Sequence, residues 1–247
     1  MFIVAMSAII FAGFFIQGVT GFGATLFVMS IALLITQREL VMPICLLYTL
    51  FQSFTIVYKN YKNVNVKHLL ISLSFAIIAG VPAGNYLIEH INDRTAKAVF
   101  AVFLLAYSII SLLGRLKNDV KEADESSKSP NTGSYLFLIA SGCFQFMYGV
   151  GGPALVTYLS RVVPHKDTLR TTICAYWLIL NSIILLYGVT QHSFTIEIKL
   201  ALLLMPGFLL GGALGSYVAW RINQRYFMIF VFSVLSLSSL LILSQTL

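Results

Sequence analysis

Charged residues divide this chain into long apolar segments. Six runs of 17 to 22 residues contain no Asp, Glu, Lys or Arg, and such lengths let a helix cross a hydrocarbon core roughly 30 Å thick. These runs are residues 40–58, 69–88, 98–114, 171–191, 200–220 and 226–247. Backbone polar groups in lipid must be satisfied within the protein, and a helix does this within a single segment. The pattern therefore predicts an all-α integral membrane protein with six spanning helices.

Two longer apolar runs, 1–37 and 129–160, are too long for one crossing and too short for two comfortable ones. Each carries a glycine motif in its middle: QGVTGFGAT from Gln17 to Thr25, and QFMYGVGGP from Gln145 to Pro153. Glycine permits the tight reversal that a broken helix needs. Each run is expected to form a glycine-broken hairpin, made either of two short crossings or of a re-entrant segment.

The two motifs belong to a longer internal repeat. The sequence ICLLYTLFQS (44–53) is echoed by ICAYWLILNS (173–182), and GVPAGNYLIEHINDR (80–94) by GGALGSYVAWRINQR (211–225). The offsets of the three echoes are 128, 129 and 131 residues, so the landmarks keep their order. We expect a first membrane repeat over 1–114, a linker over 115–133 and a second membrane repeat over 134–247.

The basic residues indicate how the repeats are oriented. Placing four connections in the cytoplasm puts 12 of the 16 Lys and Arg inside, as the positive-inside rule requires. The Lys-rich connection 58–68 corresponds to the Lys-poor 189–199, and lone Arg38 corresponds to the basic cluster 161–170. Equivalent loops thus fall on opposite faces. This predicts inverted-topology repeats in a multi-pass protein of the cell membrane, with the central loop cytoplasmic and both termini outside.

Composition supports the membrane assignment and narrows the chemistry. The chain is 58% apolar and 10% charged, with a mean hydropathy of +0.88. Its net charge of +7 is explained by loops that face anionic headgroups, so no nucleic-acid partner is expected. No acidic or basic residue lies well inside a span, and no metal or nucleotide motif occurs. We expect no enzyme activity, no metal and no cofactor.

The glycine breaks in the helices predict where the binding site lies. Broken helices at membrane depth are tolerated only inside protein or beside a water-filled cavity. Helices starting near Ala24 and Pro153 would direct N–H groups and positive dipole ends into that cavity, where they suit an anion. Amides and hydroxyls repeated in both halves would complete the site. The predicted substrate-binding residues are Gln17, Gly21, Gly23, Thr25, Gln52, Ser53, Gln145, Gly149, Gly151, Gly152, Pro153, Asn181 and Ser182.

Four other glycines are expected to serve packing instead. Gly80 with Gly84, and Gly211 with Gly215, form G-x-x-x-G pairs within otherwise regular spans. Small residues at this spacing let membrane helices approach closely.

The segment GFFIQGVTGFGA, the GVGGP at 149–153 and the G-x-x-x-G-x-Y that closes each half resemble the TauE/SafE sulfite exporter family. The resemblance covers essentially the whole chain. It implies movement of small sulfur oxyanions or organosulfonates, such as sulfite, thiosulfate or sulfoacetate, across the plasma membrane. It also implies that the glycine-rich hairpins of the two halves meet at the substrate site. The first copy departs from the family pattern, because Thr25 stands where the second copy has Pro153.

These observations favour a secondary transporter of small anions that works by alternating access between two inverted repeats. Three alternatives remain open. The substrate could be another small organic anion. The protein could be a non-transporting scaffold that binds a partner through its basic loops. An intramembrane enzyme would need a reactive group at depth, for which Cys45 with Cys174 is the repeated candidate.

Overall fold

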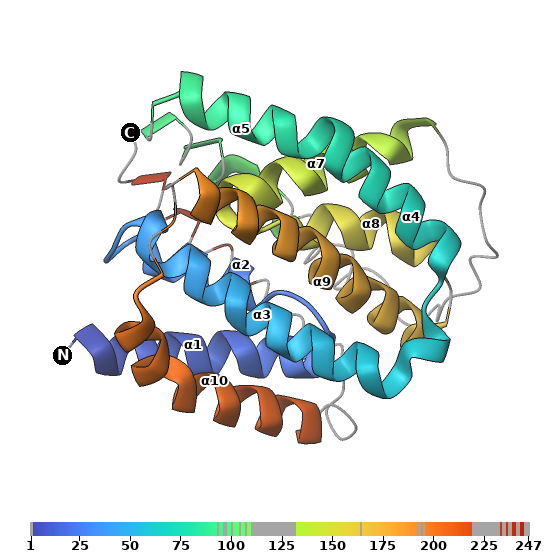
Figure 1. The fold of residues 1–247 in the computed structure, drawn as a ribbon. Coiled ribbons are helices and arrows are strands. Elements are labelled where there is room, and N and C mark those ends of the chain that lie inside the picture. The colour runs from blue at the N-terminus through green and yellow to red at the C-terminus, as the bar shows by residue number, and fades with distance from the viewer. Residues whose placement is uncertain are drawn as a thin grey trace.

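The computed structural model describes residues 2–92, 132–163, 165–191 and 196–218, with Phe194, eleven residues of 94–109 and six of 233–244. Every regular element in these described ranges is helical (Figure 1). The elements are α1 (Phe2–Thr20), α2 (Ala24–Ala32), α3 (Arg38–Asn60), η1 (Tyr61–Asn63), α4 (Val66–Phe75), η2 (Ala76–Gly80), α5 (Val81–His90), α7 (Thr132–Tyr148), α8 (Gly152–Val162), α9 (Lys166–Thr190) and α10 (Ile198–Val218).

Five helical segments of the described chain are long and apolar enough to cross a membrane: Phe2–Val19, Arg38–Asn63, Val66–His90, Asp167–Thr190 and Ile198–Val218. Four of them confirm the runs predicted at 40–58, 69–88, 171–191 and 200–220. About half of the run at 98–114 and most of the run at 226–247 lie outside the described residues, as does nearly all of the expected linker at 115–133. The chain is a multi-pass membrane protein.

Both glycine motifs break a helix. In the first half, α1 has 19 residues and spans about 28 Å, whereas α2 has nine residues and spans only about 13 Å. The two helices pack together, and a Cβ built on Gly13 would lie 2.5 Å from the Val28 side chain. In the second half, α7 has 17 residues and α8 has 11, and they also pack together. Each half therefore begins with a long helix followed by a short one that packs against it.

The broken helix of each half packs on a spanning helix of the other half. Helix α1 lies against α10 along one side of the molecule, and α7 lies against η2 and α5 along the opposite side (Figure 1). The glycines confirm the packing role that their spacing predicts. A Cβ on Gly80 would meet the Ile139 carbonyl at 2.5 Å, and one on Gly84 would meet the Cys143 carbonyl at 2.7 Å.

The matching contacts occur in the other half. A Cβ on Gly211 would clash with the Phe11 carbonyl, and one on Gly215 with the Phe15 carbonyl. Phe11 and Ile139 are 128 residues apart, as are Phe15 and Cys143, which is the offset of the glycine motifs. The internal repeat of the sequence is thus repeated in the packing.

Helices α3 and α9 pack side by side between these two outer pairs and run in opposite directions (Figure 1). The end of α3 therefore lies near the start of α9. There the Asn65 N–H donates to Thr172 Oγ1 at 2.9 Å, and η1 contacts α9. The connection 61–65 and the N-terminus of α9 consequently lie at the same end of the molecule.

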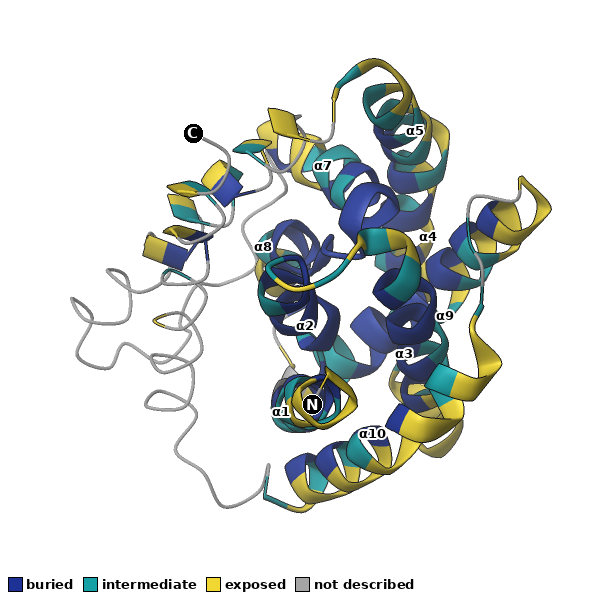
Figure 2. Cartoon of the chain, turned by 90° about the vertical axis from the view of Figure 1, so that its left-hand side faces the viewer, coloured by how far each residue is buried: buried dark blue, intermediate teal, exposed yellow. Residues whose placement is uncertain are grey.

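The short helices occupy the interior. Eight of the nine residues of α2 are buried, and Figure 2 shows α2 almost entirely dark blue between α1 and α3. Helix α10, in contrast, buries only the stripe Leu204, Phe208, Gly211 and Gly215. Its other face exposes Leu202, Leu203, Leu209, Leu210 and Leu214. An apolar face of this kind suits contact with lipid, so α2 lies in the core and α10 forms part of the outer wall.

Candidate anion-binding site

The first glycine turn joins α1 to α2. Gly21 and Gly23 adopt φ values of 83° and 95°, in the left-handed region that side chains other than glycine rarely enter. The Phe27 N–H donates to the Gly23 carbonyl at 3.0 Å and closes the first turn of α2. The N–H groups of Ala24, Thr25 and Leu26 come before this bond, so they have no partner within the helix.

The second turn joins α7 to α8 with a different geometry. Gly149 has a φ of 72°, whereas Gly151, at the N-cap of α8, has a φ of −75°. Pro153 lies in the first turn of α8, where its missing N–H costs no hydrogen bond. The prediction that helices begin near Ala24 and near Pro153 is confirmed. The two turns meet, because a Cβ on Gly149 would lie 2.7 Å from Thr25 Cγ2.

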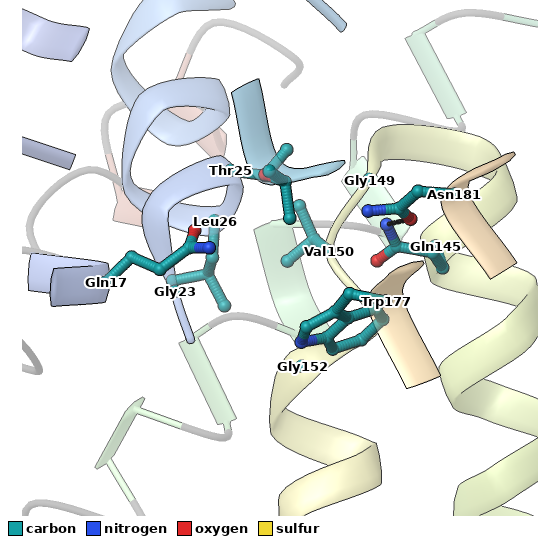
Figure 3. Close-up of a pocket in the computed structure, with 11 residues that line it drawn as sticks. Gln17, Gly23, Thr25, Leu26, Gln145, Gly149, Val150, Gly152, Trp177 and Asn181 are labelled. Carbon is teal, nitrogen blue, oxygen red and sulfur yellow. Dashed lines mark hydrogen bonds between the residues drawn. The ribbon is translucent and has the colours of Figure 1, made fainter. Parts of the chain in front are cut away.

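A small cavity of about 20 Å³ lies where the turns meet α3 and α9 (Figure 3). Both halves contribute to its wall. The lining residues are Gln17, Gly23, Thr25, Leu26, Thr49, Gln145, Gly149, Val150, Gly152, Trp177 and Asn181. None of them carries a formal charge. This volume has room for about one water molecule, so in this conformation the cavity is much smaller than a pocket that encloses a drug-sized ligand.

Two hydrogen-bond donors in this wall have no partner among the described residues. They are Gln17 Nε2, from α1, and Asn181 Nδ2, from α9. Gln17 is 2% exposed and Asn181 is fully buried. A buried N–H group without a partner costs roughly 1–3 kcal/mol. Two such donors beside one cavity, one from each half, are available to a hydrogen-bond acceptor that enters it.

A hydrogen-bond network holds the side chain of Asn181 in place. The Gly151 N–H donates to Gln145 Oε1 at 2.8 Å, and Gln145 Nε2 donates to Asn181 Oδ1 at 2.6 Å. The network links the N-terminus of α8 to the middle of α9. Figure 3 shows the hydrogen bond between the Gln145 and Asn181 side chains on the side of the cavity opposite Gln17.

The rest of the wall is partly hydroxyl and partly apolar. Thr25 and Thr49 lie with their hydroxyl oxygens 3.4 Å apart, and both are buried. Trp177, Leu26 and Val150 supply the apolar surface. In the described chain, no three His, Cys, Asp or Glu side chains gather where they could hold a metal ion. The arrangement offers neutral donors to a small polar ligand and contributes no charged side chain.

The comparison with protein families now identifies the chain. The model for the sulfite exporter TauE/SafE family matches residues 5–242. The chain belongs to the TauE/SafE family. This is a family of membrane transporters rather than of enzymes. Searches of curated proteins and of solved structures gave no match.

Seven of the thirteen residues predicted for this TauE/SafE protein line the cavity: Gln17, Gly23, Thr25, Gln145, Gly149, Gly152 and Asn181. The other six do not line it: Gly21, Gln52, Ser53, Gly151, Pro153 and Ser182. Gly21 packs against the stem of Arg170, and the Gly151 N–H is already bonded to Gln145. Pro153 is buried in the first turn of α8.

The remaining three lie on α3 and α9, and their known contacts are with other parts of the molecule. The Gln52 amide faces α10, because a Cβ on Gly212 would lie 3.3 Å from Gln52 Nε2. Ser53 is fully buried beside Cys174 of α9. Ser182 Oγ donates to the Leu178 carbonyl of its own helix.

Four cavity residues of the TauE/SafE protein were not predicted: Leu26, Thr49, Val150 and Trp177. Trp177 shares a helical face with Asn181, which was a usable signal. Thr49 could also have been found, since it lies one helical turn before Ser53 on α3. A search for repeated polar residues misses Thr49, because its counterpart in the second half is Leu178. Leu26 and Val150 carry no polar group by which a sequence search could single them out.

Two arginines make corresponding contacts in the two halves, which the sequence did not reveal. Arg38, at the start of α3, donates from Nη1 to the Met147 carbonyl at 2.9 Å. Arg170, in the second turn of α9, donates from Nη2 to the Gly18 carbonyl at 3.1 Å. Each carbonyl belongs to the last turn before a glycine break, on α7 and α1 respectively. Each arginine thus caps the broken helix of the other half, where a cation complements the helix dipole.

Proposed function

We propose that this TauE/SafE protein is a secondary transporter of small anions, with sulfur oxyanions or organosulfonates such as sulfite as its substrates. The observation that carries the proposal is the neutral cavity between the halves, into which Gln17 and Asn181 bring unpartnered N–H donors. Membership of a transporter family supports transport over mere binding. The family description, sulfite exporter, supports the sulfur anions.

The anion would lie between the N-termini of α2 and α8. Gln17 Nε2 and Asn181 Nδ2 would donate to it from opposite sides. The first N–H groups of α2 and that of Gly152 would add to these donors, and the two helix dipoles would favour its negative charge. Gly21, Gly149 and Gly151 would shape the turns around it. Gln52, Ser53 and Ser182 would support the helices behind the cavity rather than touch the anion in this conformation.

Transport would proceed by alternating access between inverted repeats over 1–114 and 134–247. The opposite directions of α3 and α9 and the matching contacts across the halves support an inverted pair. The basic connections 58–68 and 161–170, which topology rules place in the cytoplasm, lie at one end of the molecule. This supports a cell-membrane protein whose linker at 115–133 is cytoplasmic. Rocking one half against the other would then open the cavity to either side.

Thermal unfolding of the detergent-purified protein against an anion panel tests the proposal. The panel holds sulfite, thiosulfate, sulfate, sulfoacetate, lactate and chloride at matched ionic strength. A ligand at 100 times its dissociation constant stabilises the folded protein by about 2.7 kcal/mol, which shifts the midpoint visibly. We expect a selective shift with one or more sulfur anions. A shift confined to lactate would favour organic-anion transport, and a flat panel would favour a scaffold.

A glycine variant then locates the binding. Gly23→Val places a branched side chain at a φ of 95° beside the cavity, so the shift should disappear while the protein stays folded in detergent. Gly133→Val is the matched control, because a Cβ on Gly133 meets nothing within 4 Å. A full shift in Gly23→Val would place the anion elsewhere.

A further inference from the structure

We propose that Gln145 is a positioning residue that sets the charge selectivity of the cavity, by holding the Asn181 amide with its N–H group toward the ligand. The proposal rests on the function proposed above. It explains how a site without any charged side chain can prefer anions, and it gives the two repeats different tasks.

The orientation of the Gln145 amide follows from its neighbours. A backbone N–H can only donate, so the atom of Gln145 that lies 2.8 Å from the Gly151 nitrogen must be its oxygen. The Gln145 nitrogen therefore lies on the other side of the amide. It points to Asn181, 2.6 Å away.

The same reasoning fixes Asn181. The Gln145 nitrogen can only donate, so the Asn181 atom that receives its hydrogen bond must be Oδ1. This leaves Nδ2 as the free end of the Asn181 amide. Nδ2 is buried, has no partner in the described part of the chain, and belongs to a residue that lines the cavity. Figure 3 shows Nδ2 on the side of the Asn181 amide that faces Thr25.

The orientation of the side-chain amides in the cavity wall is thus set by a backbone N–H group. The Gly151 N–H orients Gln145, and Gln145 orients Asn181. If the Asn181 amide turned over, Oδ1 would face the ligand and would repel an anion. The two hydrogen bonds of the network can form together only in the orientation that presents the Asn181 N–H to the cavity. The network therefore disfavours the acceptor orientation that a cation would need.

The first half does not reproduce this network. Gln17 corresponds to Gln145, and Gln52 corresponds to Asn181. Gln52 faces Gly212 of α10, and within the described ranges both of its amide atoms lack a partner. Gln17 instead carries its own Nε2 to the cavity wall. The repeats have therefore diverged: in the first half the glutamine itself faces the ligand, whereas in the second half the glutamine positions an asparagine.

Gln145→Glu tests the proposal, with thiosulfate as the probe and thermal shift as the measure of its affinity. The ionised carboxylate of this variant accepts from the Gly151 N–H but cannot donate to Asn181 Oδ1. The Asn181 amide then turns to donate to the carboxylate, and Oδ1 faces the cavity. We expect thiosulfate affinity to fall by about tenfold or more at pH 8, the size expected for one hydrogen bond to a charged ligand.

The pH profile separates positioning from a merely structural role. Once protonated, the carboxyl group of Gln145→Glu has a carbonyl for the Gly151 N–H and an O–H for Asn181 Oδ1, so it restores the native network. Burial raises the pKa of a carboxyl group, so protonation of the introduced side chain should fall between about pH 8 and pH 5.5. Thiosulfate stays fully ionised over this range. Affinity in Gln145→Glu should therefore recover toward the wild-type value as the pH falls, and be lost as it rises.

Three further variants complete the experiment. Gln145→Met removes both hydrogen bonds without a titrating group, so its affinity should be low at every pH. Asn60→Asp, an exposed amide-to-acid change at the end of α3, should bind as wild type does. If Gln145→Glu does not fold, Gln145→Met tests the positioning role by its low affinity, and Asn181→Asp tests whether residue 181 donates to the anion, because it presents a carboxylate to the cavity at pH 8 and a donor once protonated.

The outcomes separate this inference from the function on which it rests. No thiosulfate shift in the wild-type protein would count against the proposed function itself. Wild-type binding with wild-type affinity in Gln145→Glu at pH 8 would overturn the positioning role. So would weak binding that does not recover at low pH. Loss at pH 8 with recovery toward pH 5.5 supports it.

Discussion

At the scale of single residues, the site depends on glycines that serve different purposes. Gly23 has open space around it, since a Cβ would meet only Ile16 at 3.7 Å, but its φ of 95° belongs to the left-handed region. Gly151 has an ordinary φ of −75°, but a Cβ there would clash with the Ser141 carbonyl. The first glycine is needed for its backbone conformation and the second for close packing.

These two causes predict different results for alanine. Gly23→Ala should fold with a loss of about 1–2 kcal/mol from the left-handed backbone alone. Gly151→Ala should lose more, because the clash involves backbone and α8 must move away from α7. Gly133→Ala, in open space on α7, should change stability little. Thermal unfolding in detergent checks the order. Equal stability of Gly151→Ala and Gly133→Ala would show that α8 does not pack on α7 in this way.

At the scale of elements, the sequence predicted more of the fold than of the site. Charge-free runs located α3, the α4–α5 segment, α9 and α10, because length and hydropathy alone make a spanning helix. The glycine motifs located both breaks. The sequence did not show which face of each helix points inward. Gln52 and Asn181 are equivalent in the repeat, yet only Asn181 lines the cavity, because Gln52 faces α10. Symmetry in sequence does not guarantee symmetry in side-chain packing.

The arginine caps make a prediction at the same scale. Arg38→Gln and Arg170→Gln each lose a guanidinium hydrogen bond to a carbonyl in the last turn of a broken helix. Each should lower the free energy of unfolding by about 1.5–3 kcal/mol, the range for hydrogen bonds to charged groups. Arg161→Gln, at an exposed position on α8, should stay within about 0.5 kcal/mol of the wild type. Comparable effects in all three variants would mean that positive charge in general stabilises the protein, not the two caps.

At the scale of the whole molecule, each half holds the broken helix of the other. Helix α1 rests on α10, and α7 rests on η2 and α5, so neither hairpin is enclosed by its own repeat. The cavity therefore exists only where both halves meet, and Gln17 and Asn181 reach it from different halves. A relative movement of the halves would change the cavity directly, which is what an alternating-access carrier requires.

Counterflow of ³⁵S-labelled thiosulfate in proteoliposomes tests the central claim most directly. Liposomes loaded with unlabelled thiosulfate and carrying the wild-type protein should accumulate label at a saturable rate. Asn181→Asp should reduce that rate by about tenfold or more at pH 8, because a carboxylate then faces the anion. Asn60→Asp should keep the wild-type rate. Label entry no faster than in protein-free liposomes, or equal rates in the wild type and Asn181→Asp, would contradict transport of sulfur anions through this cavity.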